Sequence, residues 1–132
     1  MLIGELFKNT NRKFRNHFFS GLGFDSQLCK KNFIFFAIKG TKNDGHRYID
    51  KAIQNGAKTI IHQKSFEGFK KKILFLNYKN VRKILAISSY KFFNKKPNNI
   101  IAVTGPNGKS SVSDFYLQIL KINKVGVASI GT

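Results

Sequence analysis

The sequence predicts an α/β protein in which short buried strands alternate with helices. Runs of apolar and β-branched residues, typical of strands inside a covered sheet, recur along the chain at residues 33–38, 57–62 and 73–76. Two further segments place their apolar residues on one helical face, at residues 44–56 and 80–93. A glycine-rich turn at residues 104–108 then stands between another apolar run and another helical pattern. Strands and helices that alternate in this order are typical of parallel-sheet folds.

The first part of the chain predicts a short helix, a loop and an interrupted strand. Residues 1–9 have helical apolar spacing, and residues 9–16 are polar and basic, as in a loop. Residues 18–24 predict a strand that contains Gly21 and Gly23. These glycines resemble the start of a G-x-G-x-x-G dinucleotide motif, but its third glycine is absent and no helical pattern follows. We therefore reject a dinucleotide site here.

The middle of the chain carries clear helix start and stop signals. Asp44 predicts an N-cap, and Gly56 lies where a C′ glycine ends the same helix. Residues 63–72 are basic and predict a surface segment without a strand. Asn77 or Asn80 predicts the cap of the next helix. The buried stripe expected for that helix consists of Val81, Ile84, Leu85, Ser88 and Phe92.

The chain is predicted to contain two domains, 1–96 and 97–132. Residues 94–99 are polar, include Pro97 and separate two αβ patterns, as a linker does. The second part predicts strands at residues 100–103 and 125–130, with a glycine loop and a helix between them. A strand–loop–helix–strand unit of this size buries too little surface and leaves open sheet edges. We therefore expect it to be the first unit of a truncated, Rossmann-like domain.

The loop of the second part predicts phosphate binding. Glycines let backbone N–H groups surround phosphate oxygens, and the start of the following helix adds a partial positive charge. Lys109 would reach the terminal phosphates, and the Ser110 hydroxyl would ligate Mg²⁺. The predicted phosphate-binding residues are Gly105, Pro106, Asn107, Gly108, Lys109, Ser110 and Ser111.

Composition restricts the class of protein. The hydrophobic content of 42% suffices for a packed core, and a single cysteine, Cys29, excludes an internal disulfide framework. No apolar run is long enough for a membrane span and the N-terminus does not resemble a signal peptide, so we expect a cytoplasmic protein. The net charge of +18 comes almost entirely from dispersed lysines. We interpret it as a solvated surface, with nucleic-acid binding as the alternative.

Four stretches resemble motifs of the Mur ligases, the ATP-dependent enzymes that add amino acids to the peptidoglycan precursor. They are Phe24-Asp-Ser-Gln27, the block from Phe35 to Ala57 with Asp44-Gly-His46, the loop Val103–Val112, and Ser129-Ile-Gly-Thr132. Within the family, they are most similar to the MurE branch, which adds the third residue of the peptide. The resemblance covers nearly the whole chain but only about the first quarter of such a ligase.

The resemblance implies a substrate, two cofactors and a set of site residues. The first domain would bind UDP-N-acetylmuramoyl-L-alanyl-D-glutamate through Phe24, Ser26, Thr41, Lys42 and Asn43. The second would bind ATP and Mg²⁺ at the glycine loop, with Lys109 as the catalytic residue. ATP would phosphorylate the D-glutamate carboxylate, and the amine of the incoming amino acid would attack the acyl phosphate. Two positions depart from the family pattern, because Gln27 replaces an arginine and Pro106 replaces a threonine that carries a backbone N–H.

Several alternatives stay open at this point. The incoming amino acid is meso-diaminopimelate or L-lysine, and residues 1–132 alone are not expected to catalyse ligation. The chain is expected to be a monomer with no nucleic-acid or membrane partner. The alternative functions are another Mur-type ligase, such as MurF, and a small basic nucleic-acid-binding protein.

Overall fold

The computed structural model describes residues 1–41 and 43–131. The chain divides into two compact units, Met1–Lys96 and Pro97–Thr132. Each unit is described by itself below, beginning with the first.

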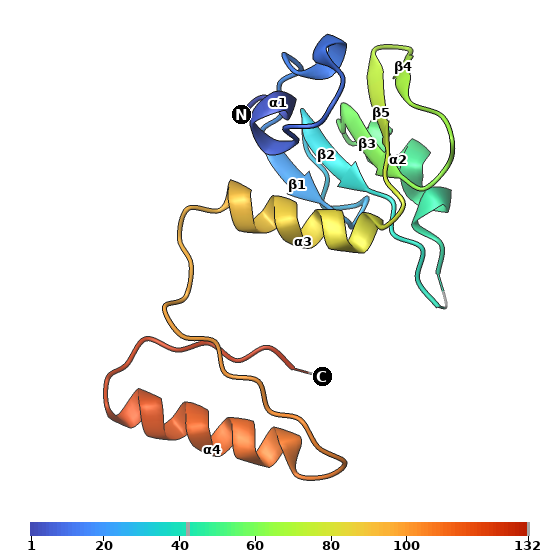
Figure 1. Cartoon of the computed structure of the whole chain (residues 1–132). Coiled ribbons are helices and arrows are strands. Elements are labelled where there is room, and N and C mark those ends of the chain that lie inside the picture. The colour runs from blue at the N-terminus through green and yellow to red at the C-terminus, as the bar shows by residue number, and fades with distance from the viewer. Residues whose placement is uncertain (42, 132) are drawn as a thin grey trace. The chain divides into compact units, whose positions relative to one another are not determined.

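The first unit is built on one five-stranded sheet with the strand order β1-β2-β3-β5-β4 (Figure 1). Four of the strands are parallel, and β4 pairs antiparallel with β5 at one edge. The strands are β1 (Gly21–Gly23), β2 (Phe33–Phe36), β3 (Thr59–His62), β4 (Gly68–Lys70) and β5 (Ile73–Asn77). This sheet confirms the predicted α/β class and the strands expected in the segments 33–38, 57–62 and 73–76.

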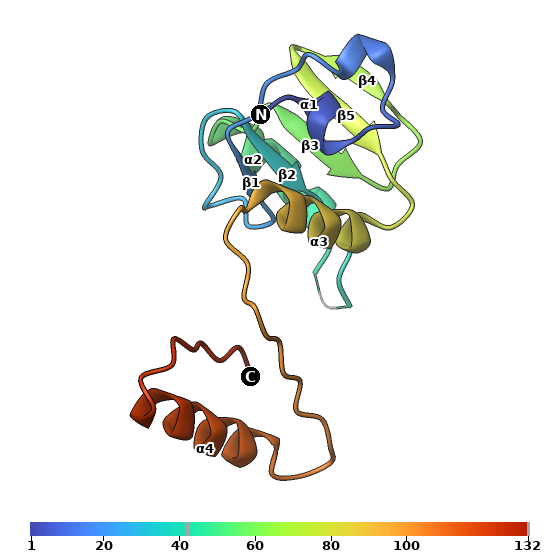
Figure 2. The same ribbon diagram turned by 60° about the vertical axis from the view of Figure 1, so that its left-hand side comes forward.

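Helices cover both faces of this sheet, as the continuous apolar strands predict (Figures 1 and 2). Alternate residues of β2 point to opposite layers, so Ile34 and Phe36 join one apolar cluster and Phe35 joins the other. The first cluster also contains residues of α1 (Ile3–Leu6) and α3 (Val81–Phe92), and the second contains Ala52 of α2 (Ile49–Gln54).

The caps that begin the helices agree with the sequence signals. The Asn80 side chain accepts a hydrogen bond from the Lys83 N–H at 2.9 Å and starts α3. Val81 and Ser88 of the predicted stripe are buried, and the Phe92 ring lies 5.6 Å from that of Phe19. Asp44 caps a 3₁₀ turn, η2 (Gly45–Tyr48), that leads directly into α2.

Two segments of the first unit differ from the sequence prediction. β4 lies inside residues 63–72, where we expected no strand, and it pairs with β5 through a two-residue turn. A 3₁₀ helix, η1 (Arg12–Phe14), lies in the segment predicted as a loop. Both elements are three residues long, which is too short for a periodic pattern to be recognised.

The second unit contains one helix, α4 (Lys109–Ile122), among its described residues. The prediction of strands at residues 100–103 and 125–130 is wrong for this structure, because neither segment forms a sheet. A strand is stabilised by ladder hydrogen bonds to a neighbour, and among the described residues of this unit these two segments are not paired with one another. Ile100 and Ile130 are accordingly exposed. In the described part of the chain, no helix has the length and hydropathy to cross a lipid bilayer.

Candidate functional site

The glycine loop of the second unit turns the chain sharply into α4. Gly105 has φ 152° and Gly108 has φ 75°, conformations that glycine adopts without steric cost. Gly108 is the N-cap, and its carbonyl accepts the first helical hydrogen bond from Val112 N–H at 3.0 Å. The backbone N–H groups of the first turn have no acceptor within the helix. They are therefore free to bind an anion.

Lys109 folds back over this loop. Its Nζ lies 2.6 Å from the Gly105 carbonyl oxygen and 3.3 Å from that of Pro106. The ammonium group thus lies against the loop backbone and close to the start of α4. An exposed ammonium beside free N–H groups is suited to the oxygens of a phosphate.

The hydrogen-bond donors around the loop suit the phosphates of ATP, although the loop lacks one backbone donor. Ser110 and Ser111 lie exposed in the first turn of α4, where a hydroxyl oxygen can ligate Mg²⁺. Pro106 has no N–H, so the loop offers one backbone donor fewer than a loop without proline would. Among the described residues, no group of three or more His, Cys, Asp and Glu side chains could hold a metal by itself. Ser110 would thus be one ligand of an ion held mainly by phosphate oxygens and water.

The predicted substrate residues of the first unit follow two neighbouring strands. Phe24 and Ser26 come directly after β1, and Thr41 and Asn43 lie in the loop after β2. Because β1 and β2 pair in parallel, both loops leave the same edge of the sheet. Phe24 is 69% exposed, whereas Ser26 is 6% exposed. The prediction for Lys42 lies outside the described residues.

Short hydrogen bonds fix these two loops. The Asp25 carboxylate accepts from Gln27 N–H at 2.8 Å, and the Asn55 amide donates to the Ser26 carbonyl at 2.8 Å. In the second loop, Gly40 N–H donates to the Asn43 carbonyl at 2.8 Å. The exposed ring of Phe24 therefore stands on a fixed backbone, which suits stacking against a flat ligand.

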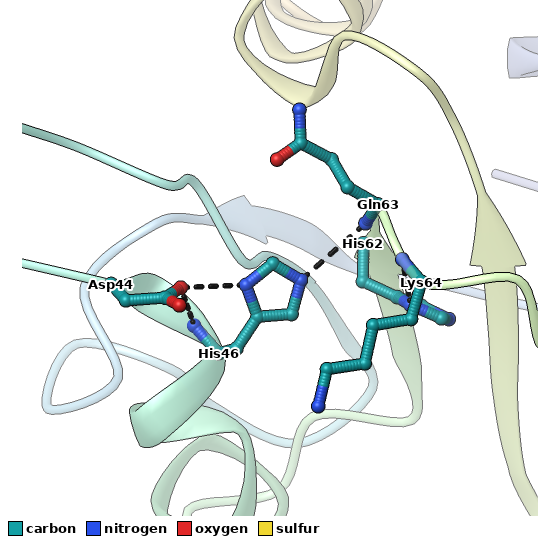
Figure 3. A network of polar contacts seen from close by, with 5 residues as sticks. All are labelled: Asp44, His46, His62, Gln63 and Lys64. Carbon is teal, nitrogen blue, oxygen red and sulfur yellow. Dashed lines mark hydrogen bonds and ion pairs between the residues drawn. The ribbon is translucent and has the colours of Figure 1, made fainter.

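A polar network at the same edge was not predicted from the sequence (Figure 3). The Asp44 carboxylate accepts from the His46 backbone N–H at 3.0 Å and contacts His46 Nδ1 at 2.6 Å. The backbone N–H of His46, followed by its ring, lowers the pKa of Asp44 below its usual value. The other ring nitrogen of His46 faces the N–H of Gln63 at 3.4 Å. The sequence gives no sign of this network beyond Asp44, because Gln63 is distant from His46 along the chain.

Cys29 lies below the loop after β1 and is buried. Its Sγ contacts the Asp25 carbonyl at 3.4 Å, and burial, followed by the charge of Asp25, raises the pKa of the thiol to about 11. A thiol in this state is a poor nucleophile.

Comparison with known proteins identifies the family of this chain. A family profile described as "Mur ligase family, catalytic domain" matches residues 18–93, which lie within the first unit. The chain belongs to the Mur ligase family. The matched range includes the loops after β1 and β2, which contain the predicted substrate residues.

Two relatives are ligases of the same name. The UDP-N-acetylmuramoyl-L-alanyl-D-glutamate–2,6-diaminopimelate ligase of Rickettsia prowazekii is 39% identical over 124 residues, which are 94% of this chain and 25% of the relative. The ligase of that name from Clostridium tetani is 41% identical over 113 residues, or 83% of this chain and 23% of the relative. This Mur ligase chain therefore spans about a quarter of the length of such relatives.

A solved Mur ligase has the same fold. The MurF ligase of Thermotoga maritima, in complex with ADP, superposes with a TM-score of 0.60 and 25% sequence identity. The superposition covers 76% of this chain and 23% of the MurF chain.

Proposed function

We propose that this chain is part of an ATP-dependent ligase that extends UDP-N-acetylmuramoyl-L-alanyl-D-glutamate by its third amino acid. The observation that carries the proposal is the Lys109 ammonium, which lies against a glycine loop at the start of α4. The family and the names of its relatives support the same reaction and favour 2,6-diaminopimelate over L-lysine as the added residue. They also favour a ligase over the nucleic-acid-binding alternative.

The loop of residues Gly105–Ser111 would hold ATP in this reaction. ATP supplies the phosphoryl group that turns the D-glutamate carboxylate into an acyl phosphate, which the incoming amine then attacks. Lys109 would neutralise charge that develops on the phosphate oxygens, and Ser110 would offer a hydroxyl oxygen to Mg²⁺. The ADP bound to the MurF relative supports the use of an adenine nucleotide.

The first unit would bind the uridine end of the substrate at the carboxyl edge of β1 and β2. The ring of Phe24 would stack on the base, and Ser26 would form hydrogen bonds with it. Thr41, Lys42 and Asn43 would surround the rest of the nucleotide. We also propose that the protein acts as a cytoplasmic monomer, since such a substrate is a water-soluble nucleotide sugar.

Titration with UDP tests the first unit. The folded chain should bind UDP, and Phe24→Ala should weaken binding about tenfold or more, because a stacked base is worth about 1–3 kcal/mol. Phe18→Ala is the matched control, since Phe18 is also exposed but precedes β1 at the other end of that strand. A folded chain that shows no heat of UDP binding in calorimetry would contradict the proposal.

Titration with ATP and Mg²⁺ tests the second unit separately. Lys109→Met keeps the aliphatic stem and removes the charge, so we expect ATP affinity to fall about tenfold. Lys121→Met removes a charge from the last turn of the same helix and should leave ATP affinity unchanged. Equal effects of the two substitutions would show that only general charge matters.

A further inference from the structure

His46 links the loop after β2 to the residue that follows β3 (Figure 3). Through Nδ1 it contacts Asp44, at the end of the loop after β2. Through Nε2 it contacts the N–H of Gln63, which follows β3. The Gln63 side chain in turn donates to the Lys79 carbonyl at 2.9 Å, in the connection after β5. Only 10% of the His46 side chain is exposed.

One neutral tautomer of His46 satisfies both of its contacts. The Asp44 carboxylate can only accept, so Nδ1 must carry the proton at the 2.6 Å contact. The backbone N–H of Gln63 can only donate, so Nε2 must be unprotonated. The ring therefore bridges Asp44 and Gln63, with one hydrogen bond at each ring nitrogen.

The ring contacts are separate from the helix cap at the same position. Asp44 caps the η2 turn through the backbone N–H of His46, at 3.0 Å, and any residue except proline supplies that N–H. The ring adds a second bond to the same carboxylate oxygen. A cap alone therefore does not explain why an imidazole lies here.

The ring holds one end of the loop after β2 in place. Asp44 forms an antiparallel bridge with Lys39, and Gly45 N–H donates to the Ile38 carbonyl at 2.9 Å. Between these residues, Gly40 N–H donates to the Asn43 carbonyl. A contact that fixes Asp44 thereby fixes the base of the turn that presents Thr41 and Asn43.

We propose that His46 is a positioning residue for nucleotide binding, which fixes the base of the loop after β2, at Lys39 and Asp44, relative to the carboxyl ends of β3 and β5. This inference rests on the proposed function, because that loop is the one assigned to the nucleotide part of the substrate. The ligand is a uridine nucleotide, and His46 acts on it through the loop.

The test combines UDP titration with amide hydrogen exchange on the 132-residue chain. His46→Ala should weaken UDP binding about tenfold, as expected for the loss of a charge-assisted hydrogen bond. It should also speed exchange at the amides of Gly40 and Gly45, while Ala37, which donates to the Ile61 carbonyl inside the sheet, stays protected. His46→Asn keeps a donor near the Nδ1 position, so it should recover most of both effects.

The control variant is His17→Ala, which removes a half-buried histidine that lies outside this network, against Phe69. It should leave UDP affinity unchanged even if it lowers stability. The inference is overturned if the His46→Ala variant binds UDP as tightly as the wild type. It is also overturned if the amide of Ala37 loses as much protection as those of Gly40 and Gly45. A His46→Asn variant that binds UDP no better than His46→Ala would overturn it as well. If the folded wild-type chain does not bind UDP, the proposed function itself fails.

Discussion

His62 is a buried histidine whose Nε2 has no hydrogen-bond partner. Its Nδ1 accepts from Lys64 N–H at 3.1 Å, and its ring packs against Phe75 at 5.6 Å. Burial lowers the pKa of His62 below its usual value. His17 has a lowered pKa for the same leading reason, which is burial.

Stability should therefore fall in mild acid. In the unfolded chain His62 binds a proton near the ordinary histidine pKa of about 6.5, whereas the folded chain binds it only at lower pH. At pH values below that ordinary pKa, the unfolded state holds more protons than the folded state. As the pH falls, each such histidine therefore lowers the free energy of unfolding by up to about 1.4 kcal/mol for every pH unit. Urea midpoints measured on both sides of that value should show the loss. His62→Gln should reduce the pH slope but not abolish it, since His17 still titrates, and an unchanged slope would contradict the assignment.

Cys29 should be unreactive in the folded chain. Its thiol has a pKa raised to about 11 by burial, and thiolate is the species that reacts with alkylating agents. Iodoacetamide at neutral pH should label it slowly in buffer and rapidly in denaturing urea, as followed by mass spectrometry. Rapid labelling in buffer would mean that the loop after β1, which lies over Cys29, opens readily.

At the scale of elements, the β4–β5 hairpin has an unfavourable turn. Lys71 and Lys72 both have positive φ, at 48° and 66°, in the two-residue connection between the paired residues Lys70 and Ile73. Such turns favour Asn-Gly, because a side chain in the left-handed region costs about 1–2 kcal/mol.

Replacing this turn should stabilise the protein. Lys71→Asn with Lys72→Gly should raise the free energy of unfolding by about 1–2 kcal/mol, measured by urea denaturation. The control is Lys71→Gln with Lys72→Gln, which removes the same charges without relieving the backbone and should give no comparable gain. Equal stabilisation by both pairs would show that charge repulsion, not turn conformation, is the cause.

The sequence predicted the elements whose signal is local and missed those that depend on distant partners. β2 is buried on both faces, so its apolar run was sufficient to predict it. β4 exists because β5 offers it a hydrogen-bonding edge, and Gly-Phe-Lys carries no pattern of its own. The apolar segments 100–103 and 125–130 have strand-like composition but no such edge, and they stay unpaired.

The same distinction applies to the candidate sites. The helix that begins at Lys109 was predicted, because glycines, lysine and helical pattern are adjacent in sequence. The network of His46 was missed, because Gln63 approaches it only after β3 is placed beside β2. The sequence signal that was available is Asp44-Gly-His46, in which a carboxylate and an imidazole two residues apart can share a hydrogen bond.

At the scale of the whole molecule, the core belongs to the first unit. Both apolar clusters consist of residues before position 93, and α4 contains no buried residue. Since burial of apolar surface is the main favourable contribution to folding, residues 1–96 carry nearly all of the stabilising contacts. The apolar side chains of α4, such as Val112, Phe115 and Ile119, are exposed. The 14 residues of this helix are near the length at which an isolated helix is marginal in water.

A fragment that ends at the linker should therefore fold as it does within the full chain. A fragment of residues 1–96 should unfold cooperatively in urea, with the same midpoint as residues 1–132 when followed by circular dichroism. A peptide of residues 97–132 should show weak helicity and no cooperative transition, because it buries too little surface to fix α4. If the urea midpoint of the fragment 1–96 is well below that of the full chain, residues 97–132 contribute stabilising contacts. The two apolar clusters would then not account for the stability of the fold. If the midpoints agree, UDP binding can be assigned to the first unit by repeating the titration on the fragment alone.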